Sequence, residues 1–183
     1  SGTSQVAWTF KKKAKFFDVV TYTGTGVTDR TVSHNLGISP GMVIVKRTNG
    51  ADSWLILHRS EPSSNLFLNL TNAASSTLRI KSMDSTTFTL DNGQVNESGQ
   101  TYVAYIFAHD TASDSRIKCG SYTGNGANTG IFQDLGWIPQ WIMVKVSSST
   151  DGWILLDSVR GVTGGNDPRL EANTNAGDAS GTI

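Results

Sequence analysis

Apolar and polar residues alternate over short stretches along most of this chain, and glycine, asparagine, aspartate or serine separates the stretches. A period of two predicts β-strands, and no stretch carries the capped 3.6-residue apolar stripe of a helix. In Thr101–Phe107 both alternating faces are apolar, which predicts a central strand buried on each side. The predicted strands are Phe16–Thr23, Met42–Arg47, Trp54–His58, Leu66–Leu70, Thr86–Leu90, Thr101–Phe107, Lys118–Thr123, Trp141–Val146, Trp153–Asp157 and Arg169–Asn173.

Turn residues indicate how these strands connect. The link between Met42–Arg47 and Trp54–His58 is short and contains Asn49-Gly50, so we expect the two strands to form a hairpin. Pro40 and Pro139 precede equivalent strands, where the missing proline N–H costs no ladder hydrogen bond. Many short strands with frequent turns favour an all-β fold of β-sandwich, jelly-roll-like modules.

The sequence repeats itself after about one hundred residues. Tyr22–Gly26 returns as Tyr122–Gly126, an offset of 100 (from 22 to 122), and Trp54–Leu57 returns as Trp153–Leu156, an offset of 99 (from 54 to 153). A period of this length is a whole module, since solenoid coils repeat every 20 to about 50 residues. We therefore expect tandem modules at residues 1–110 and 111–183.

The repeat also predicts what the chain holds at its two ends. Val6–Phe10 resembles Val103–Phe107, so residues 1–15 are expected to carry the last strand of a preceding repeat and its connector. Thr174 matches Thr71 at an offset of 103, which leaves the second module without its two closing strands. The residues thus look like a segment of a longer protein. We expect Val6–Phe10 to pair in a sheet, and it is a candidate to fill the place of the missing closing strand.

Composition excludes several classes of partner. The 15 basic and 15 acidic residues balance, whereas nucleic-acid-binding domains carry a basic face. Cys119 is the single cysteine, so neither an intrachain disulfide nor a cysteine-rich zinc site is expected. No apolar run reaches the roughly 18 residues that a membrane span needs. We predict no nucleic acid, no membrane insertion, no metal and no cofactor.

A catalytic residue of the module is expected to recur in the second copy, and the three histidines do not. His34 has no histidine counterpart, His58 aligns with Asp157, and His109 lies in the polar linker between the modules. The chain also lacks a nucleophile elbow and a paired-histidine metal motif. A carboxylate pair for glycoside cleavage stays open, because acidic residues are scattered through the turns. We predict a protein without enzymatic activity and assign no catalytic residue.

Two further motifs receive a structural interpretation. The glycines of Tyr22–Gly26 do not open a helix, as a phosphate-binding loop requires, so we expect a turn after a strand. The basic run Lys11–Lys15 is either a grip for a phosphate or acidic glycan, or a solvated connector whose lysines discourage edge-to-edge pairing. Its counterpart in the second module is not basic, which favours the connector.

Tryptophans carry the strongest hint of a contact surface. Trp54 and Trp153 share one module position beside apolar residues, which predicts core or inter-module packing, and Trp8 receives the same interpretation. Trp137 and Trp141 are additions of the second module. They are the candidate contact residues for a glycan or a neighbouring protein, although burial of large aromatic residues favours packing.

Several phrases of the sequence resemble a recurring module of tailed-bacteriophage structural proteins, especially tail-fibre-like and appendage proteins of marine phages. The phrases are Trp8–Lys12, Phe16–Gly24, His34–Gly37, Pro40–Lys46, Trp54 with His58–Ser60, and Val95–Asn96 with Ser98–Tyr105. In that family the modules stand in tandem inside long virion proteins. The shared motifs are structural and identify no catalytic site.

The resemblance implies a non-enzymatic structural component at the surface of a virion, in a tail fibre, knob or capsid appendage, with a role in host attachment. The implied partners are other virion proteins, copies of the chain itself and a host-surface glycan. The alternative is a carbohydrate-binding module of a secreted or virion-associated glycan-degrading protein, which predicts Trp137 and Trp141 exposed side by side. A catalytic hydrolase domain instead requires carboxylates gathered in a cleft.

Overall fold

The structure is a computed structural model of the 183-residue chain, and it describes residues 5–127, 130–162, 166–175, 177 and 179–182. This part of the chain forms three antiparallel sheets of five, four and three strands, and no helix. It therefore holds no helical segment of the length and apolarity that crossing a bilayer demands. The strands are β1 (Phe17–Thr23), β2 (Arg30–Ser33), β3 (Pro40–Arg47), β4 (Leu55–His58), β5 (Leu66–Phe67), β6 (Ile80–Met83), β7 (Thr87–Leu90), β8 (Thr101–Ala108), β9 (Trp141–Lys145), β10 (Trp153–Asp157), β11 (Asn166–Glu171) and β12 (Ala179–Thr182).

The five-stranded sheet has the order β1-β8-β3-β4-β5, so β8 lies in its interior as the sequence predicted. Strand β8 pairs with β1 on one edge, with Val19 opposite Tyr105, and with β3 on the other, with Ile44 opposite the same residue. The predicted hairpin is confirmed, because β3 and β4 pair with Ile44 opposite Ile56. We call strands β1 to β8 the first unit.

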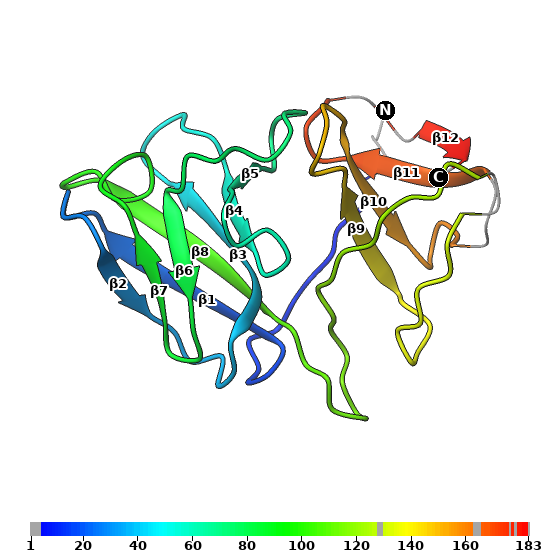
Figure 1. The fold of residues 1–183 in the computed structure, drawn as a ribbon, viewed down its shortest axis with the longest axis horizontal. Helices are drawn as coiled ribbons and strands as arrows, with labels where there is room; N and C mark the ends of the chain where they lie inside the picture. Colours follow the sequence, from blue (N-terminus) through cyan, green and yellow to red (C-terminus); the bar gives the residue numbers. More distant parts are fainter. Residues whose placement is uncertain (1–4, 128–129, 163–165, 176, 178, 183) are drawn as a thin grey trace.

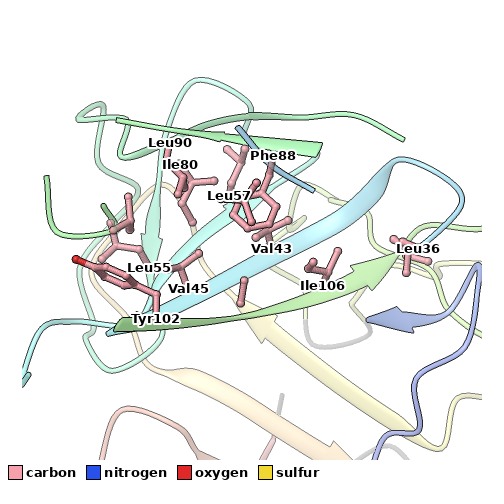
Figure 2. Close-up of a cluster of buried hydrophobic side chains, with 14 residues drawn as sticks. Leu36, Val43, Val45, Leu55, Leu57, Ile80, Phe88, Leu90, Tyr102 and Ile106 are labelled. Carbon is pink, nitrogen blue, oxygen red and sulfur yellow. The ribbon is translucent and has the colours of Figure 1, made fainter. Parts of the chain in front are cut away.

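A fully apolar core lies between the five-stranded sheet and the three-stranded sheet β2-β7-β6 (Figure 2). Alternate residues of β3, β4 and β8 point into it from one sheet, and β2, β6 and β7 contribute from the other. Each large side chain removed from water in this way contributes about 1.5–3 kcal/mol. The buried members are Val32, Leu36, Val43, Val45, Leu55, Leu57, Ile80, Phe88, Leu90, Val95, Tyr102, Ala104, Ile106 and Ala108.

A second core joins the first unit to the four-stranded sheet β12-β11-β10-β9, which we call the second unit. The opposite face of β3 and β4, with Met42 and Ile56, packs in one cluster with Trp153 and Leu155 of β10. Figure 1 shows the two groups of strands side by side, with the N-terminal segment (blue) running between them. The predicted packing role of the recurrent tryptophan is confirmed, since Trp153 is buried in this shared core.

Hydrogen bonds reinforce the contact between the units. The indole Nε1–H of Trp153 donates to the carbonyl of Phe67 at 2.7 Å. Backbone N–H groups donate across the contact as well, from Ala74 to Ser147 and from Asp151 to Thr71, both at 2.8 Å. We conclude that the two units are held by a shared core and by specific polar contacts together.

The repeat seen in the sequence recurs in the strand registers. In the first unit Ile44 stands opposite Ile56, and in the second Met143 stands opposite Leu155, so the hairpin β9–β10 repeats β3–β4 at an offset of 99 residues. Leu170 pairs with Leu155 as Leu66 pairs with Ile56. The offset is 104 at this third strand (from 66 to 170), one residue more than the match of Thr71 with Thr174 predicts.

Local contacts recur at equivalent positions too. The Oδ1 atom of Asn69 accepts the backbone N–H of Trp54 at 2.9 Å, and Asn173 accepts that of Trp153 at 2.6 Å. Gly136 adopts φ of 76°, close to the 79° of its counterpart 99 residues earlier, a conformation that favours glycine. The two halves therefore share backbone geometry as well as sequence.

Two expected strands do not form. Residues Lys118–Thr123 contain no strand. Their counterpart β1 pairs only with β8 in the first unit, and no described residue takes the place of β8 in the second. The prediction that Val6–Phe10 pairs in a sheet is also wrong, because the backbone of this segment joins no ladder and its side chains pack instead. Strands β2, β6 and β12 were not predicted.

Candidate contact surface around Trp137 and Trp141

Trp141 opens strand β9, and aromatic rings from the N-terminal segment contact it. Its ring centroid lies 5.6 Å from that of Phe10 and 6.5 Å from that of Trp8, both in edge-to-face geometry. Such pairs contribute about 0.5–1.5 kcal/mol beyond the burial of their area. Trp141 is thus half-buried by the chain's own side chains.

Trp8 is fixed by polar contacts as well. Its indole Nε1–H donates to Asp157 Oδ2 at 3.2 Å, and the guanidinium carbon of Arg160 lies 5.8 Å from the Trp8 ring centroid. Arg160 Nε also donates to Asp157 at 2.9 Å. The carboxylate of Asp157, at the end of β10, therefore binds both Trp8 of the N-terminal segment and Arg160.

Asp157 is a buried carboxylate whose negative charge is compensated. Burial opposes its ionisation, but hydrogen bonds from the backbone N–H and the guanidinium of Arg160 and from Trp8 outweigh this and hold the pKa of Asp157 below its ordinary value. Its Oδ1 also accepts the backbone N–H of Val159 at 3.1 Å. The equivalent residue of the first unit, His58, also accepts the backbone N–H two residues later: its Nδ1 accepts that of Ser60 at 3.2 Å.

Phe10 connects the aromatic contact to the first unit. Its ring centroid lies 5.6 Å from those of Phe17 in β1 and Phe107 in β8, the same separation as from Trp141. These rings belong to the core that the two units share. The side chains of the N-terminal segment thus pack between the two units.

Trp137 has a different environment. It is half-buried, and no aromatic ring pair joins it to Trp141 in the described part of the chain. Both indole N–H groups are shielded and have no acceptor among the described residues. Near them in sequence, Phe132 and Ile138 are 89% and 91% exposed. This part of the second unit presents apolar side chains to solvent, whereas the two indole N–H groups are buried without an acceptor in the described structure.

The predicted basic connector has a specific structural partner. Lys12 from the basic run pairs with the buried Asp18, Nζ to Oδ1 at 2.7 Å. Val19 donates its backbone N–H to the same Oδ1 at 2.9 Å, and Asn35 donates its backbone N–H to Oδ2 at 2.8 Å. Burial opposes ionisation, yet these hydrogen bonds outweigh it and hold the pKa of Asp18 below its ordinary 3.8. Sequence reasoning missed the buried Asp18 and Asp157, since neither lies in a motif.

The histidines and the cysteine have backbone partners. His34 Nε2 lies 3.1 Å from the carbonyl of Asp84, and His109 Nδ1 accepts the N–H of Cys119 at 3.1 Å. Burial raises the pKa of the Cys119 thiol to about 12, which suppresses the reactive thiolate. These contacts agree with the structural interpretation of the histidines.

An open hollow of about 270 Å³ lies beside β4 and β6 and is bordered by His58, Arg59 and Lys81. Burial and the neighbouring charge of Arg59 lower the pKa of His58, so it is neutral at physiological pH. Lys81 is already paired with Asp29. In the part of the chain that the structure describes, no three histidine, cysteine or carboxylate side chains gather as metal ligands.

Comparison with known families gives one match, which covers residues 2–182 and is described as a domain of unknown function, DUF7483. The chain belongs to this family. No curated protein and no solved structure shows significant similarity to it. The DUF7483 match spans both units and the N-terminal segment. This extent agrees with the shared core, which makes the two repeats one structural entity.

Proposed function

We propose that this DUF7483 chain is a non-enzymatic structural component of a tailed-phage virion, located at the particle surface in a tail fibre, knob or capsid appendage, where it contributes to host attachment. One observation carries the proposal: two copies of the same β-hairpin unit pack face to face through a shared core. Repeated modules with rigid contacts are typical of proteins that build extended assemblies.

We further infer that the first unit is a β-sandwich. Its five-stranded and three-stranded sheets contribute to one apolar core, and residues from both alternate between that core and the outside. A sandwich with both faces of its larger sheet covered resists local opening, because strands β3, β4 and β8 are buried on each side. Resistance to opening is the property that a virion appendage requires.

The partners follow from charge and surface. With balanced charge, the chain is proposed to bind other virion proteins and copies of itself, without nucleic acid, membrane insertion or a cofactor. The exposed side chains of Phe132 and Ile138 support a contact with a protein that offers apolar surface.

The carbohydrate-binding alternative places the same tryptophans against a sugar ring. Trp141 supports this alternative less well, because Phe10 and Trp8 already contact its ring. Trp137 has no such ring contact in the described part of the chain, so it is the residue on which the two functions differ. A glycan array probed with the wild-type chain and with Trp137→Ala separates them: Trp137-dependent sugar binding would favour the alternative.

Localisation tests the main proposal directly. Antibodies raised against the chain are applied to particles purified from a lysate of the host that carries the gene, followed by gold labelling and electron microscopy. We expect label at an appendage or at the capsid surface. Label confined to soluble secreted protein, with particles unlabelled, would refute the virion role.

A further inference from the structure

We infer that the second unit is an acceptor for a closing β-segment with the pattern of Val95–Ala108, supplied by another module of this family. Strand β9 is at the edge of its sheet, with β10 as its only neighbour among the described strands. Its counterpart β3 has two neighbours, β4 and β8. This inference stands on the repeat itself and does not depend on the virion role.

A pair of equivalent glycines shows that the place of the closing segment is filled in the first unit and open in the second. A Cβ atom added to Gly24 would lie 2.8 Å from the carbonyl carbon of Glu97 and 2.9 Å from that of Asn96. A Cβ added to Gly124 would meet nothing within 4 Å. The backbone that closes over Gly24 therefore has no counterpart over Gly124 in the described structure.

The apolar row on strand β9 is also less covered than its counterpart on β3. Val43 and Val45 of β3 are 0% and 1% exposed, because they face the first core. Their counterparts on β9, Ile142 and Val144, are only half-buried. An edge strand with a partly exposed apolar row is the kind of site that accepts an added strand, which supplies main-chain hydrogen bonds and alternate side chains together.

The first unit specifies the occupant and its register. In that unit Phe107 stands opposite Met42 and Tyr105 opposite Ile44. Transferred by the 99-residue offset of the hairpins, the added strand places its Phe107 equivalent opposite Trp141 and its Tyr105 equivalent opposite Met143. The loop before it places a Glu97 equivalent over Gly124.

The chain's own N-terminal segment does not occupy this edge. Trp8 and Phe10 contact the ring of Trp141, but the backbone of residues 5–12 makes no backbone hydrogen bond in the described structure. The second edge of β9 therefore keeps its main-chain groups available. The same segment of a second copy is thus an alternative occupant that the experiment has to distinguish.

The test is a fusion that brings the closing segment close to the second unit. Residues Val95–Ala108 are appended to the C-terminus through a flexible glycine–serine linker of about 20 residues. The matched control carries the same residues in scrambled order. Amide hydrogen exchange of the β9 region is followed by mass spectrometry, and we expect it to slow by about tenfold or more relative to the control.

Gly124→Ala in the fusion decides the register. The added methyl group blocks the loop that crosses Gly124, so we expect it to restore the fast exchange of β9. Three outcomes overturn the inference: equal exchange in fusion and scrambled control, slowed exchange at another edge such as β5, or slowed exchange of β9 that Gly124→Ala leaves intact. Exchange of β9 that slows with protein concentration in the unfused chain would instead assign the site to a second copy.

Discussion

Alanine at two equivalent glycines is expected to destabilise the chain in the first unit and to leave its stability nearly unchanged in the second. At Gly24 the new Cβ lies inside contact distance of three main-chain atoms of Asn96 and Glu97. Main-chain atoms cannot rotate away as a flexible side chain does, so the loop must move. At Gly124 the same atom enters open space. Neither glycine has a positive φ, so backbone strain does not explain any difference.

The magnitude follows from the hydrogen bonds that hold the displaced loop. Gly24 N–H donates to Gln100 at 2.7 Å, Gly26 N–H donates to Asn96 at 2.7 Å, and Gly99 N–H donates to Gly24 at 2.9 Å. Losing three bonds of about 0.5–1.5 kcal/mol each destabilises the chain by about 2–4 kcal/mol. For a chain of this length the melting temperature falls by about 5–15 °C.

Gly124→Ala is the matched control. Alanine restricts the unfolded chain more than glycine does, so the free energy of unfolding should stay within about 1 kcal/mol of the wild type. Both variants and the wild type are melted by circular dichroism and by calorimetry under one buffer condition. Equal destabilisation at the two positions, or an unchanged stability of Gly24→Ala, would refute the conclusion that backbone covers Gly24 and leaves Gly124 open.

Three further predictions concern single side chains. Asn65→Ala removes a fully buried amide whose Oδ1 accepts two backbone N–H groups, at 2.6 and 3.0 Å. We expect the free energy of unfolding, measured by urea titration, to fall by about 2–4 kcal/mol, and a loss below about 0.5 kcal/mol would contradict this. Asp18 has a lowered pKa, so its contribution to stability is complete above its unfolded pKa and is lost as pH falls through the folded pKa. Asp18→Asn should therefore flatten the loss of stability below about pH 4 in melts across pH, and an unchanged acid limb would count against it. Trp8→Phe keeps an aromatic ring but loses the hydrogen bond to Asp157, so trypsin should cleave at Lys11–Lys15 several-fold faster; an unchanged cleavage rate would show that the bond does not hold the segment.

Local pattern was sufficient to predict the hairpin of β3 and β4. Met42–Arg47 and Trp54–His58 carry apolar residues on both faces and a glycine turn between them, so strand identity and pairing follow from neighbouring residues. In the second unit β9 and β10, whose strands were predicted at the equivalent positions, pair in the same register. Strand β8 was equally predictable, because two apolar faces require a place inside the sheet.

Strands β2 and β6 were missed for a physical reason. Each has four residues, with a single buried apolar side chain, Val32 in β2 and Ile80 in β6. A period of two cannot be recognised from one residue, and these strands form because β7 offers them a ladder on each side. At Lys118–Thr123 a strand was predicted and none forms. The strand-like sequence stays irregular because the described residues provide no partner strand for it.

The candidate site was predictable only at its tryptophans. Their absence from the first unit identified Trp137 and Trp141 as unusual, but the contacts of Trp141 come from residues more than 130 positions earlier in the chain, and Trp8 reaches Asp157 across 149 positions. Neither Asp157 nor Asp18, both buried, is distinguished in sequence from an aspartate in a turn. These sites are created by packing between residues that are distant in sequence, and such contacts cannot be predicted from sequence periodicity.

The two units differ in how they bury the same hairpin, and this difference makes the second unit depend on the first. The first unit covers one face of its larger sheet with its own second sheet and the other face with the second unit. In the second unit, Trp153 and Leu155 are buried in the core that the two units share. Separation would expose Met42, Ile44 and their partners in the shared core at once, whereas the first core would stay intact. The second repeat is therefore stabilised by the first, and the family match over residues 2–182 includes both sides of the shared core.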